Sequence, residues 1–360
     1  MTDKVQFTIK PELLAALGKV SGTTLSPVSP FRYGKEMDTA AATAQLAALG
    51  ICDEKGTLAA DKKEAVTMLA QAEAFTRIYL TTSSKVIEYI AYFGPGGKIT
   101  GLTNDSGMQI ITFPAPNDAM MELVRQTIGF SVYRTSPFTA QLTRAETLVF
   151  AAAVDLQRKE MLRKFADGKA ADRLAISAKD IAGMLKTPPG NFQWLSSAFA
   201  DLFTGVRIAD ETGVAPLFGS LAAKNLVTLS GKTASLSDES LLLARGHLLP
   251  SMYLTLTAGK AQPSGKTNAA GFSCIISGIH DLLSIEYNAD EVELRSVASA
   301  EIHEYVKAFL TDPSLHAGMD TFSGAAGAAA GKKERHFCPQ CGASLKPGLK
   351  FCSQCGAKIS

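Results

Sequence analysis

The chain has 360 residues, of which 46% are hydrophobic and 19% are charged, so it has room for two or three domains of ordinary soluble globular composition. No apolar run approaches the roughly 18 residues of a membrane span, and the first residues lack the basic-then-apolar pattern of an export signal. These features exclude a membrane span and predict a cytoplasmic protein. The formal net charge of +2 is divided unevenly, because residues 332–360 carry six Lys or Arg against one Glu (+5) and residues 1–331 carry −3. Such a basic tail favours an acidic partner without specifying nucleic acid.

The first 135 residues predict an α+β unit. Apolar residues recur at helical spacing up to about residue 74 and then alternate with polar residues, with turn-rich stretches at 94–97 and 104–107. The expected elements are a strand at 5–9, helices at 11–17, 39–49 and 60–74, strands at 78–82, 86–93, 98–103 and 108–113, and a closing helix at 118–128.

Residues 136–205 predict a helical connector. A capping box of Thr143 and Glu146 begins a long helix that is expected to run to residue 166. Two shorter helices are expected at 177–187 and 192–203. The single Trp194 lies in the last of them, where the pattern favours a core anchor over an exposed stacking platform.

Residues 206–312 predict a second α+β unit that repeats the first. At offsets of 174 to 175, residues 46–48 match 221–223, Gly56 matches Gly231, and 78–81 match 252–255. A polar loop is expected at 258–270, followed by strands at 272–279, 282–287 and 291–297 and a helix at 301–310. The sequence therefore predicts an internally duplicated helix–antiparallel meander–helix unit, the two copies packing about a pseudo-twofold axis.

The chain ends in two cysteine arms, at residues 336–360, after a Gly- and Ala-rich stretch at 313–335 that predicts a flexible linker. The arms read FCPQCGA and FCSQCGA and repeat at an offset of fourteen residues. In each arm two thiolates stand two residues apart, and the Gly after the second Cys permits the backbone to turn beneath a metal ion. Together the arms predict one tetrahedral four-cysteine metal site.

This stretch resembles the short zinc ribbons found at the ends of many bacterial and archaeal proteins. The resemblance implies that one structural zinc ion is held by Cys338, Cys341, Cys352 and Cys355. It also implies a small apolar cluster around the metal, formed by Phe337, Leu345, Leu349, Phe351 and Ile359. Two disulfides or a rubredoxin-like iron site are the alternatives. Zinc is favoured because nothing in the chain suggests export, and a rubredoxin carries a much longer insert between its arms.

The order of elements before residue 312 is similar to that of the type VII (ESX) secretion-associated chaperones. An Ala-rich helix, a Gly56-Thr57-Leu58 turn, a second helix, a meander and a closing helix are followed by a diverged second copy. The resemblance implies that the chain holds protein partners. It assigns no functional residue, and the cysteine arms are an addition to the family's pattern.

No set of residues in the sequence predicts catalysis. The stretch 94–100 departs from a phosphate-binding loop because Ile99 occupies the Ser/Thr position, and His303-Glu304 lacks the second His of a zinc hydrolase. Cys52 and Cys274 stand alone among apolar residues, which predicts reduced buried thiols. We therefore expect no catalytic residues and no organic cofactor.

Two functions remain for this chain at the level of sequence. The first is a non-enzymatic zinc-binding protein-interaction or adaptor protein. The alternative is a DNA- or RNA-associated regulator that uses the basic cysteine arms and a winged-helix-like segment at 214–236, with residues 176–185 as an earlier helix. Only Lys224 would supply a cation to the recognition helix of that segment, so we expect weak DNA binding by the body.

Overall fold

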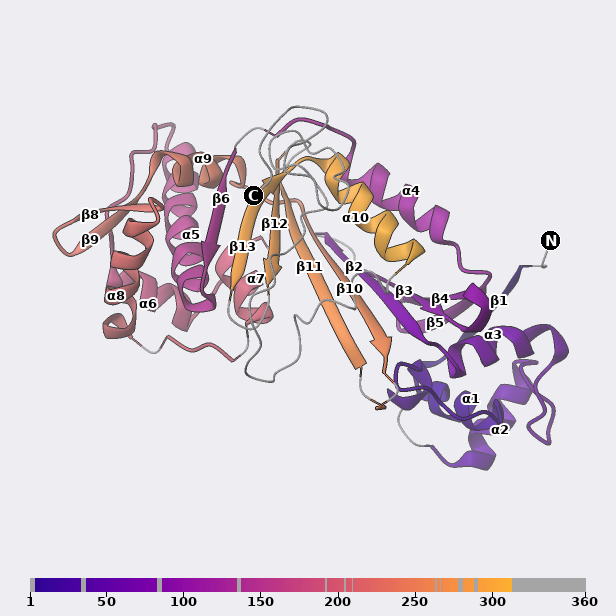
Figure 1. The fold of residues 1–360 in the computed structure, drawn as a ribbon. Coiled ribbons are helices and arrows are strands. Elements are labelled where there is room, and N and C mark those ends of the chain that lie inside the picture. Colours follow the sequence, from indigo (N-terminus) through magenta and orange to yellow (C-terminus); the bar gives the residue numbers. More distant parts are fainter. Residues whose placement is uncertain are drawn as a thin grey trace.

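The computed structural model describes residues 4–33, 37–82, 86–134, 137–191, 193–203, 205–208, 210–262, 264–265, 267–277, 281–287 and 291–312. Within these ranges the fold is α+β, with two antiparallel sheets (Figure 1). The large sheet contains β1 (Val5–Ile9), β2 (Ala74–Thr82), β3 (Val86–Phe93), β4 (Ile99–Asp105), β5 (Met108–Phe113), β6 (Thr139–Leu142), β10 (Met252–Ala261), β11 (Thr267–Ser277), β12 (Asp281–Tyr287) and β13 (Val292–Val297). The small sheet contains β7 (Ile176–Ser177), β8 (Val227–Ser230) and β9 (Thr233–Leu236) in the order β7-β9-β8.

Helices flank the large sheet. Short 3₁₀ turns lie at Pro11–Leu13, Pro30–Tyr33 and Pro95–Gly97. The α-helices are α1 (Leu14–Val20), α2 (Thr39–Ala48), α3 (Ala60–Ala70), α4 (Asn117–Ile128), α5 (Arg144–Ala166), α6 (Ala178–Lys186), α7 (Leu195–Leu202), α8 (Glu211–Ala223), α9 (Asp238–Gly246) and α10 (Ser299–Thr311).

The strand order of the large sheet has the same pattern on both sides of its centre. The order is β1-β5-β4-β3-β2-β10-β11-β12-β13-β6, and every neighbouring pair is antiparallel. Outward from the β2–β10 junction, each half contains four strands in chain order and then an earlier strand at the edge. The junction itself is a long ladder from Thr82–Met252 to Ala74–Lys260. A side chain at Gly259 would overlap the ring of Phe75, so the absence of a Cβ lets that ring cover the junction.

Successive side chains of each strand point to opposite faces of the large sheet, and different helices cover the two faces. In β3, Tyr89 belongs to the core beneath α4 and α10, whereas Tyr92 belongs to the core shared with α1–α3. In β12, Leu282 lies beneath α4 and α10, whereas Leu283 belongs to the core of α5–α9. Figure 1 shows the resulting arrangement: α4 and α10 lie over the middle strands, with α1–α3 at one end of the sheet and α5–α9 at the other.

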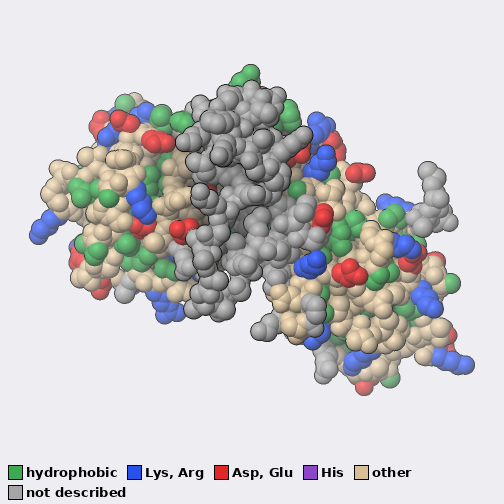
Figure 2. Space-filling model, in the orientation of Figure 1, with side chains coloured by type: hydrophobic (Ala, Val, Ile, Leu, Met, Phe, Trp, Pro, Cys, Tyr) green, Lys and Arg blue, Asp and Glu red, His purple; other side chains and the backbone are tan. Residues whose placement is uncertain are grey.

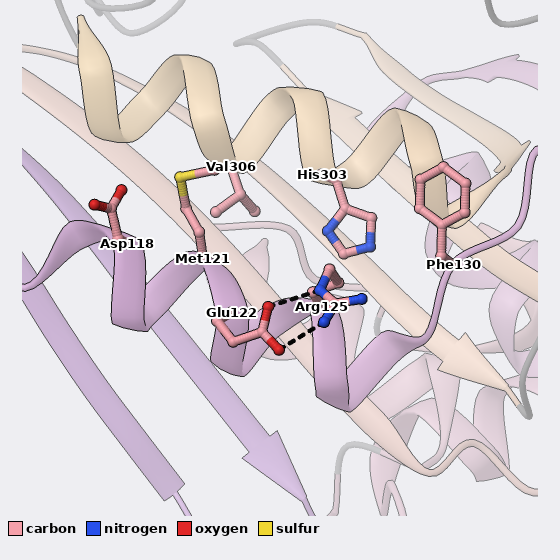
Figure 3. Close-up of a pocket in the computed structure, with 7 residues that line it drawn as sticks. All are labelled: Asp118, Met121, Glu122, Arg125, Phe130, His303 and Val306. Carbon is pink, nitrogen blue, oxygen red and sulfur yellow. Dashed lines mark hydrogen bonds and ion pairs between the residues drawn. The ribbon is translucent and has the colours of Figure 1, made fainter.

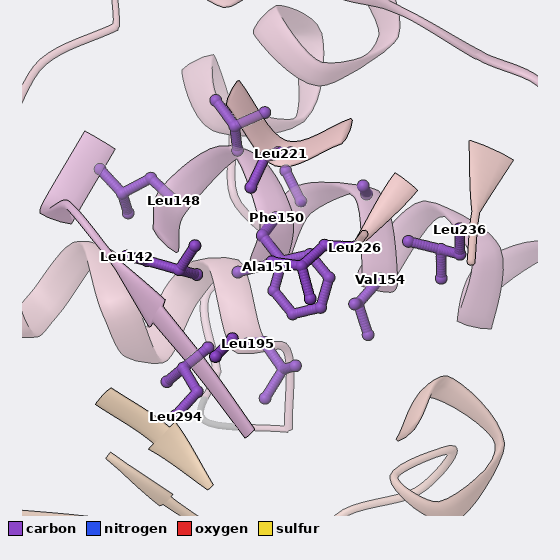
Figure 4. Packing of buried hydrophobic residues seen from close by; sticks show 14 of the residues in the cluster. Leu142, Leu148, Phe150, Ala151, Val154, Leu195, Leu221, Leu226, Leu236 and Leu294 are labelled. Carbon is purple, nitrogen blue, oxygen red and sulfur yellow. The ribbon is translucent and has the colours of Figure 1, made fainter. Parts of the chain in front are cut away.

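The largest core surrounds α5, which is buried along most of its length. Figure 4 shows Phe150 of α5 among leucines from α8, from the small sheet and from strands of the large sheet. The ring of Phe150 also stacks on Phe138, with centroids 5.8 Å apart. The predicted capping box is present, since Thr143 Oγ1 accepts from the Glu146 N–H and Glu146 Oε2 accepts from the Thr143 N–H.

The α+β content predicted from the sequence is confirmed, and several boundaries need correction. The polar loop expected at 258–270 is wrong, because β10 extends to residue 261 and β11 begins at residue 267. The backbone groups of the small and polar residues in this stretch form the β10–β11 ladder, which includes the pair Lys260–Asn268. Strand β2 begins at residue 74, where a helix was expected, because pairing with β3 and β10 overrides the helical preference of alanine.

Other predictions fall partly or wholly outside what the structure describes. The linker at 313–335 and the cysteine arms at 336–360 lie outside the described residues, as does the side chain of Cys274. Cys52 is buried, as expected. Trp194, for which the sequence favoured a core anchor, is half-buried, and the guanidinium of Arg158 lies 5.1 Å from the centre of its ring. Strand β6 lies in the range predicted as a helical connector and pairs with β13, although the domain boundaries themselves stay a prediction.

Candidate metal centre and binding surfaces

An exposed apolar segment directly follows α4 in the chain and lies in contact with the start of α10. Phe130, Val132 and Tyr133 have exposed fractions of 65%, 58% and 80%. We call these three residues the aromatic edge. Adjacent exposed side chains of this size are unusual on a soluble surface and mark places where proteins contact one another.

The backbone of the aromatic edge is held in place by polar contacts. The Ser131 N–H donates to Ser299 Oγ at 2.6 Å, and the Ala300 N–H donates to the Ser131 carbonyl at 3.0 Å. The Tyr133 N–H in turn donates to Ser131 Oγ at 3.1 Å. Because this backbone is fixed before any partner arrives, the three apolar side chains are presented at a small entropic cost of binding.

A shallow groove between α4 and α10 continues from the aromatic edge (Figure 3). The two helices run antiparallel, since Asn117 Nδ2 donates to the Leu310 carbonyl at 3.0 Å and His303 Nε2 donates to the Gly129 carbonyl at 2.8 Å at the other end. The groove has a volume of about 280 Å³. It is lined by Asp118, Met121, Glu122, Arg125, Phe130, His303 and Val306.

The groove has an apolar floor and an acidic rim. The ring of Phe130 stacks on His303 with centroids 5.9 Å apart, and Figure 3 shows Met121 and Val306 meeting across the groove. Arg125 donates two hydrogen bonds of 2.7 Å to Glu122, and these bonds, with one from Gln126, lower the pKa of the Glu122 carboxyl to about 2. The charge of Arg125 is thereby balanced, which leaves the groove with the net negative charge of Asp118.

A second titratable cluster is fully buried where α5, α7 and the end of α9 meet. Asp155 accepts hydrogen bonds from Arg158 Nη1 at 2.5 Å and from the Ser196 N–H at 2.8 Å. Arg158 also donates to the carbonyls of Gln193 and Leu248, which fixes the chain on both sides of it. These bonds satisfy the carboxylate and both terminal nitrogens of the guanidinium, whereas Arg158 Nε meets no hydrogen-bond partner among the described residues. The cluster is therefore suited to holding three helices together.

His247 lies beside this cluster and is buried. Burial and, to a smaller extent, the charge of Arg158 together lower the pKa of its imidazole to about 3. Among the described residues, no hydrogen-bond partner meets its Nδ1 atom. His247 is therefore neutral at neutral pH.

The segment expected to resemble a winged helix has the predicted elements, namely helix α8 followed by the β8–β9 hairpin, with β7 completing the small sheet. Lys224, the cation at the end of helix α8, is bound to Glu146 at 2.7 Å. Although burial opposes ionisation, hydrogen bonds from Lys224 and Ser220 lower the pKa of Glu146 to about 2. Lys224 is thus committed to an ion pair with a buried carboxylate instead of being available to a phosphate.

The predicted zinc ligands Cys338, Cys341, Cys352 and Cys355 lie outside the described residues. Within the part that the structure describes, no group of three or more His, Cys, Asp or Glu residues could hold a metal ion, and no helix is long and apolar enough to cross a membrane.

Comparison with known proteins characterises the cysteine arms. The family model of the zinc-ribbon domain matches residues 337–359. This end of the chain is a zinc ribbon. The match covers both arms and all four predicted ligands, so the resemblance seen in the sequence is confirmed for this domain, and zinc ribbons bind zinc through paired cysteine arms of this kind.

The body that precedes the zinc ribbon has weaker likenesses. No curated protein matches the chain. Among solved structures, the body weakly resembles the type VII secretion system chaperone EspG5 of Mycobacterium tuberculosis, solved in complex with a PE25–PPE41 dimer. The identity is 8% and the TM-score 0.43, over 84% of this chain and 95% of the other.

The nucleic-acid alternative receives no support from these observations. On the face seen in Figure 2, Lys and Arg side chains are interspersed with Asp and Glu over the described surface. Helix α8 begins at Glu211 with Asp210 as its N-cap, and Lys224 at its C-cap is bound to Glu146. A phosphate backbone would meet carboxylates at one end of this helix and a neutralised cation at the other.

The sequence missed the aromatic edge and the buried cluster. Phe130, Val132 and Tyr133 follow Gly129, which has a positive φ of 67°, so the signal was a helix-ending glycine followed by apolar residues in a short loop. Asp155 and Arg158 stand three residues apart on a helix, which on sequence alone reads as a surface ion pair.

Proposed function

We propose that this chain is a non-enzymatic, cytoplasmic protein-interaction or adaptor protein that carries one structural zinc ion in its C-terminal zinc ribbon. The observation that carries the metal assignment is the pair of CxxCG arms within the zinc-ribbon match at 337–359. Four thiolates complete a tetrahedral zinc site and leave no position for a substrate, so the ion stabilises the ribbon instead of catalysing a reaction.

The interaction role is supported by the body. The aromatic edge presents three apolar side chains on a backbone that hydrogen bonds already fix. The buried charged groups Asp155, Glu146 and Glu301 are each committed to a structural ion pair, with Arg158, Lys224 and Arg295 respectively. In the described body, these buried charges therefore hold structural elements together. The exposed side chains of the aromatic edge form a potential contact surface.

We also propose that the body arose by duplication of one α+β unit. The matching strand order on both sides of the β2–β10 junction supports this reading, as do the sequence matches at offsets of 174 to 175. In this proposal the units span 1–135 and 206–312, with 136–205 between them and 313–335 tethering the ribbon at 336–360.

The metal assignment predicts a defined zinc stoichiometry. The full chain, purified without added zinc, is expected to contain one zinc per chain by elemental analysis. Replacing one ligand, as in Cys352→Ser, is expected to reduce the zinc content severalfold, because a three-thiolate remnant loses both an anionic ligand and the closed geometry.

Cys52→Ser is the matched control for this experiment. Cys52 is a buried thiol of the body, far from the cysteine arms in sequence, so its replacement is expected to leave one zinc per chain. Equal zinc contents in the two variants, or iron in place of zinc in the parent chain, would show that the assignment is wrong.

A further inference from the structure

The aromatic edge and the α4–α10 groove share Phe130 and together form one apolar surface on the described body. The edge exposes Phe130, Val132 and Tyr133, and the groove adds the half-buried Met121, with the buried Val306 beneath it. An uncovered surface of this kind promotes association of the free protein. We propose that residues 336–360 of the same chain dock on this surface when no partner protein is bound, so that a partner must displace the zinc ribbon to reach the edge.

This proposal rests on the proposed function, because the docking module is the zinc-bound ribbon. The composition of residues 336–360 complements the surface. They contain no Asp or Glu, three Lys, and five large apolar residues, Phe337, Leu345, Leu349, Phe351 and Ile359. Two of the lysines directly follow leucines, at Leu345-Lys346 and Leu349-Lys350. Apolar side chains with neighbouring ammonium groups suit a groove that has an apolar floor and an acidic rim.

The charges of the groove also favour contact with the lysines of residues 336–360. The residues that line the groove include two carboxylates, Asp118 and Glu122, against one guanidinium, Arg125, so the Asp, Glu and Arg side chains of the lining sum to a charge of −1. The exposed Glu304 of α10 lies next to His303 in sequence. A lysine approaching this rim meets attraction from Asp118, whereas an acidic segment would be repelled.

The chain is long enough to reach the surface from where the described body ends. Helix α10 has 13 residues, so its end lies about 20 Å along the helix axis from its start beside the aromatic edge. Residues 313–335 provide 23 residues, which span up to about 75 Å when extended. Docking within one chain is therefore geometrically permitted. A tether of this length also gives the ribbon an effective concentration on the order of millimolar at the groove. A free competitor of equal affinity would need a similar concentration in solution to displace it.

Photo-crosslinking in the full chain tests the docking. A photoreactive residue is introduced as Tyr133→benzoylphenylalanine, and the matched control is Tyr33→benzoylphenylalanine, because Tyr33 is a similarly exposed tyrosine (77% against 80%) on the α1–α3 side of the sheet. Both replacements lie on the surface, so the fold is expected to be kept. After irradiation of dilute protein, crosslinks are mapped by mass spectrometry, and zinc is measured on the same samples.

The expected result is a crosslink from position 133 to residues 336–360 in protein of monomer mass. Its yield should be severalfold higher than from position 33 and should be lost after zinc is removed by a chelator. Equal yields from the two positions, no crosslink to 336–360, or crosslinks confined to dimers would overturn the docking. If one zinc per chain is present in those samples, the proposed zinc ribbon survives that failure; if zinc is absent, the ribbon assignment fails first.

Discussion

Replacing Asp155 by alanine is expected to lower the free energy of unfolding by about 3–5 kcal/mol, the largest single effect that we predict for the body. The carboxylate is fully buried and accepts hydrogen bonds from Arg158, Ser196 and the Leu195 N–H. Its removal leaves the guanidinium of Arg158 buried without its counter-charge and leaves the first N–H groups of α7 without an acceptor. Urea unfolding followed by the fluorescence of Trp194, whose ring contacts Arg158, measures the change.

The same helix provides a matched control for that measurement. Glu160 and Arg163 form an ion pair with the same spacing of three residues, but Arg163 is exposed. Glu160→Ala is expected to cost less than about 1 kcal/mol, because solvent screens an exposed pair. The double variant Asp155→Ala/Arg158→Met is expected to regain part of the loss, since it removes the uncompensated charge. A loss for Asp155→Ala no larger than that for Glu160→Ala would contradict the structural role of the cluster.

Acidification is expected to destabilise the body through His247. Its pKa is about 3 in the folded protein and 6.5 without the effects of burial, so below pH 6.5 the unfolded chain binds a proton that the folded chain does not. Stability from this residue is therefore complete above pH 6.5 and is lost as the pH falls toward 3. Between pH 7.5 and pH 5 the loss amounts to about 2 kcal/mol.

His247→Leu isolates this contribution from that of other groups. The variant is expected to lose about 2 kcal/mol less than the parent chain between pH 7.5 and pH 5, whatever its stability at pH 7.5. Urea unfolding at four or five pH values in that interval gives the two slopes, and comparing the two proteins cancels the titration of the carboxyl groups that they share. Parallel slopes for the two proteins would mean that His247 is protonated as easily in the folded state as in the unfolded one.

The features that could be predicted from the sequence depend on local chemistry. The start of α5 follows from Thr143 and Glu146, whose reciprocal bonds join residues three apart. The cysteine arms were identifiable because four ligands and two glycines fall within one short stretch, and the zinc-ribbon match at 337–359 agrees with them. When the residues of a motif are neighbours in sequence, their spacing alone largely fixes how they lie relative to one another.

The features that were missed depend on contacts between distant segments. The burial of Asp155 and Arg158 is created by α7 and by the residues after α9, which lie about 40 and 90 positions away. The length of β10 is set by pairing with β2 and β11, although its own Gly259 and Lys260 favour a loop. The aromatic edge is exposed because Ser131 binds the start of α10, which is 168 residues further along the chain.

X-ray absorption at the zinc edge of the full, unmodified chain tests the central claim most directly. A structural zinc ribbon predicts four sulfur neighbours at about 2.3 Å and no nitrogen or oxygen neighbour. The spectrum should also be unchanged by Cys52→Ser, because that thiol belongs to the body. A shell with nitrogen, oxygen or fewer than four sulfurs would contradict a closed four-cysteine site. An oxygen neighbour from water would indicate an open position of the kind found in catalytic zinc sites.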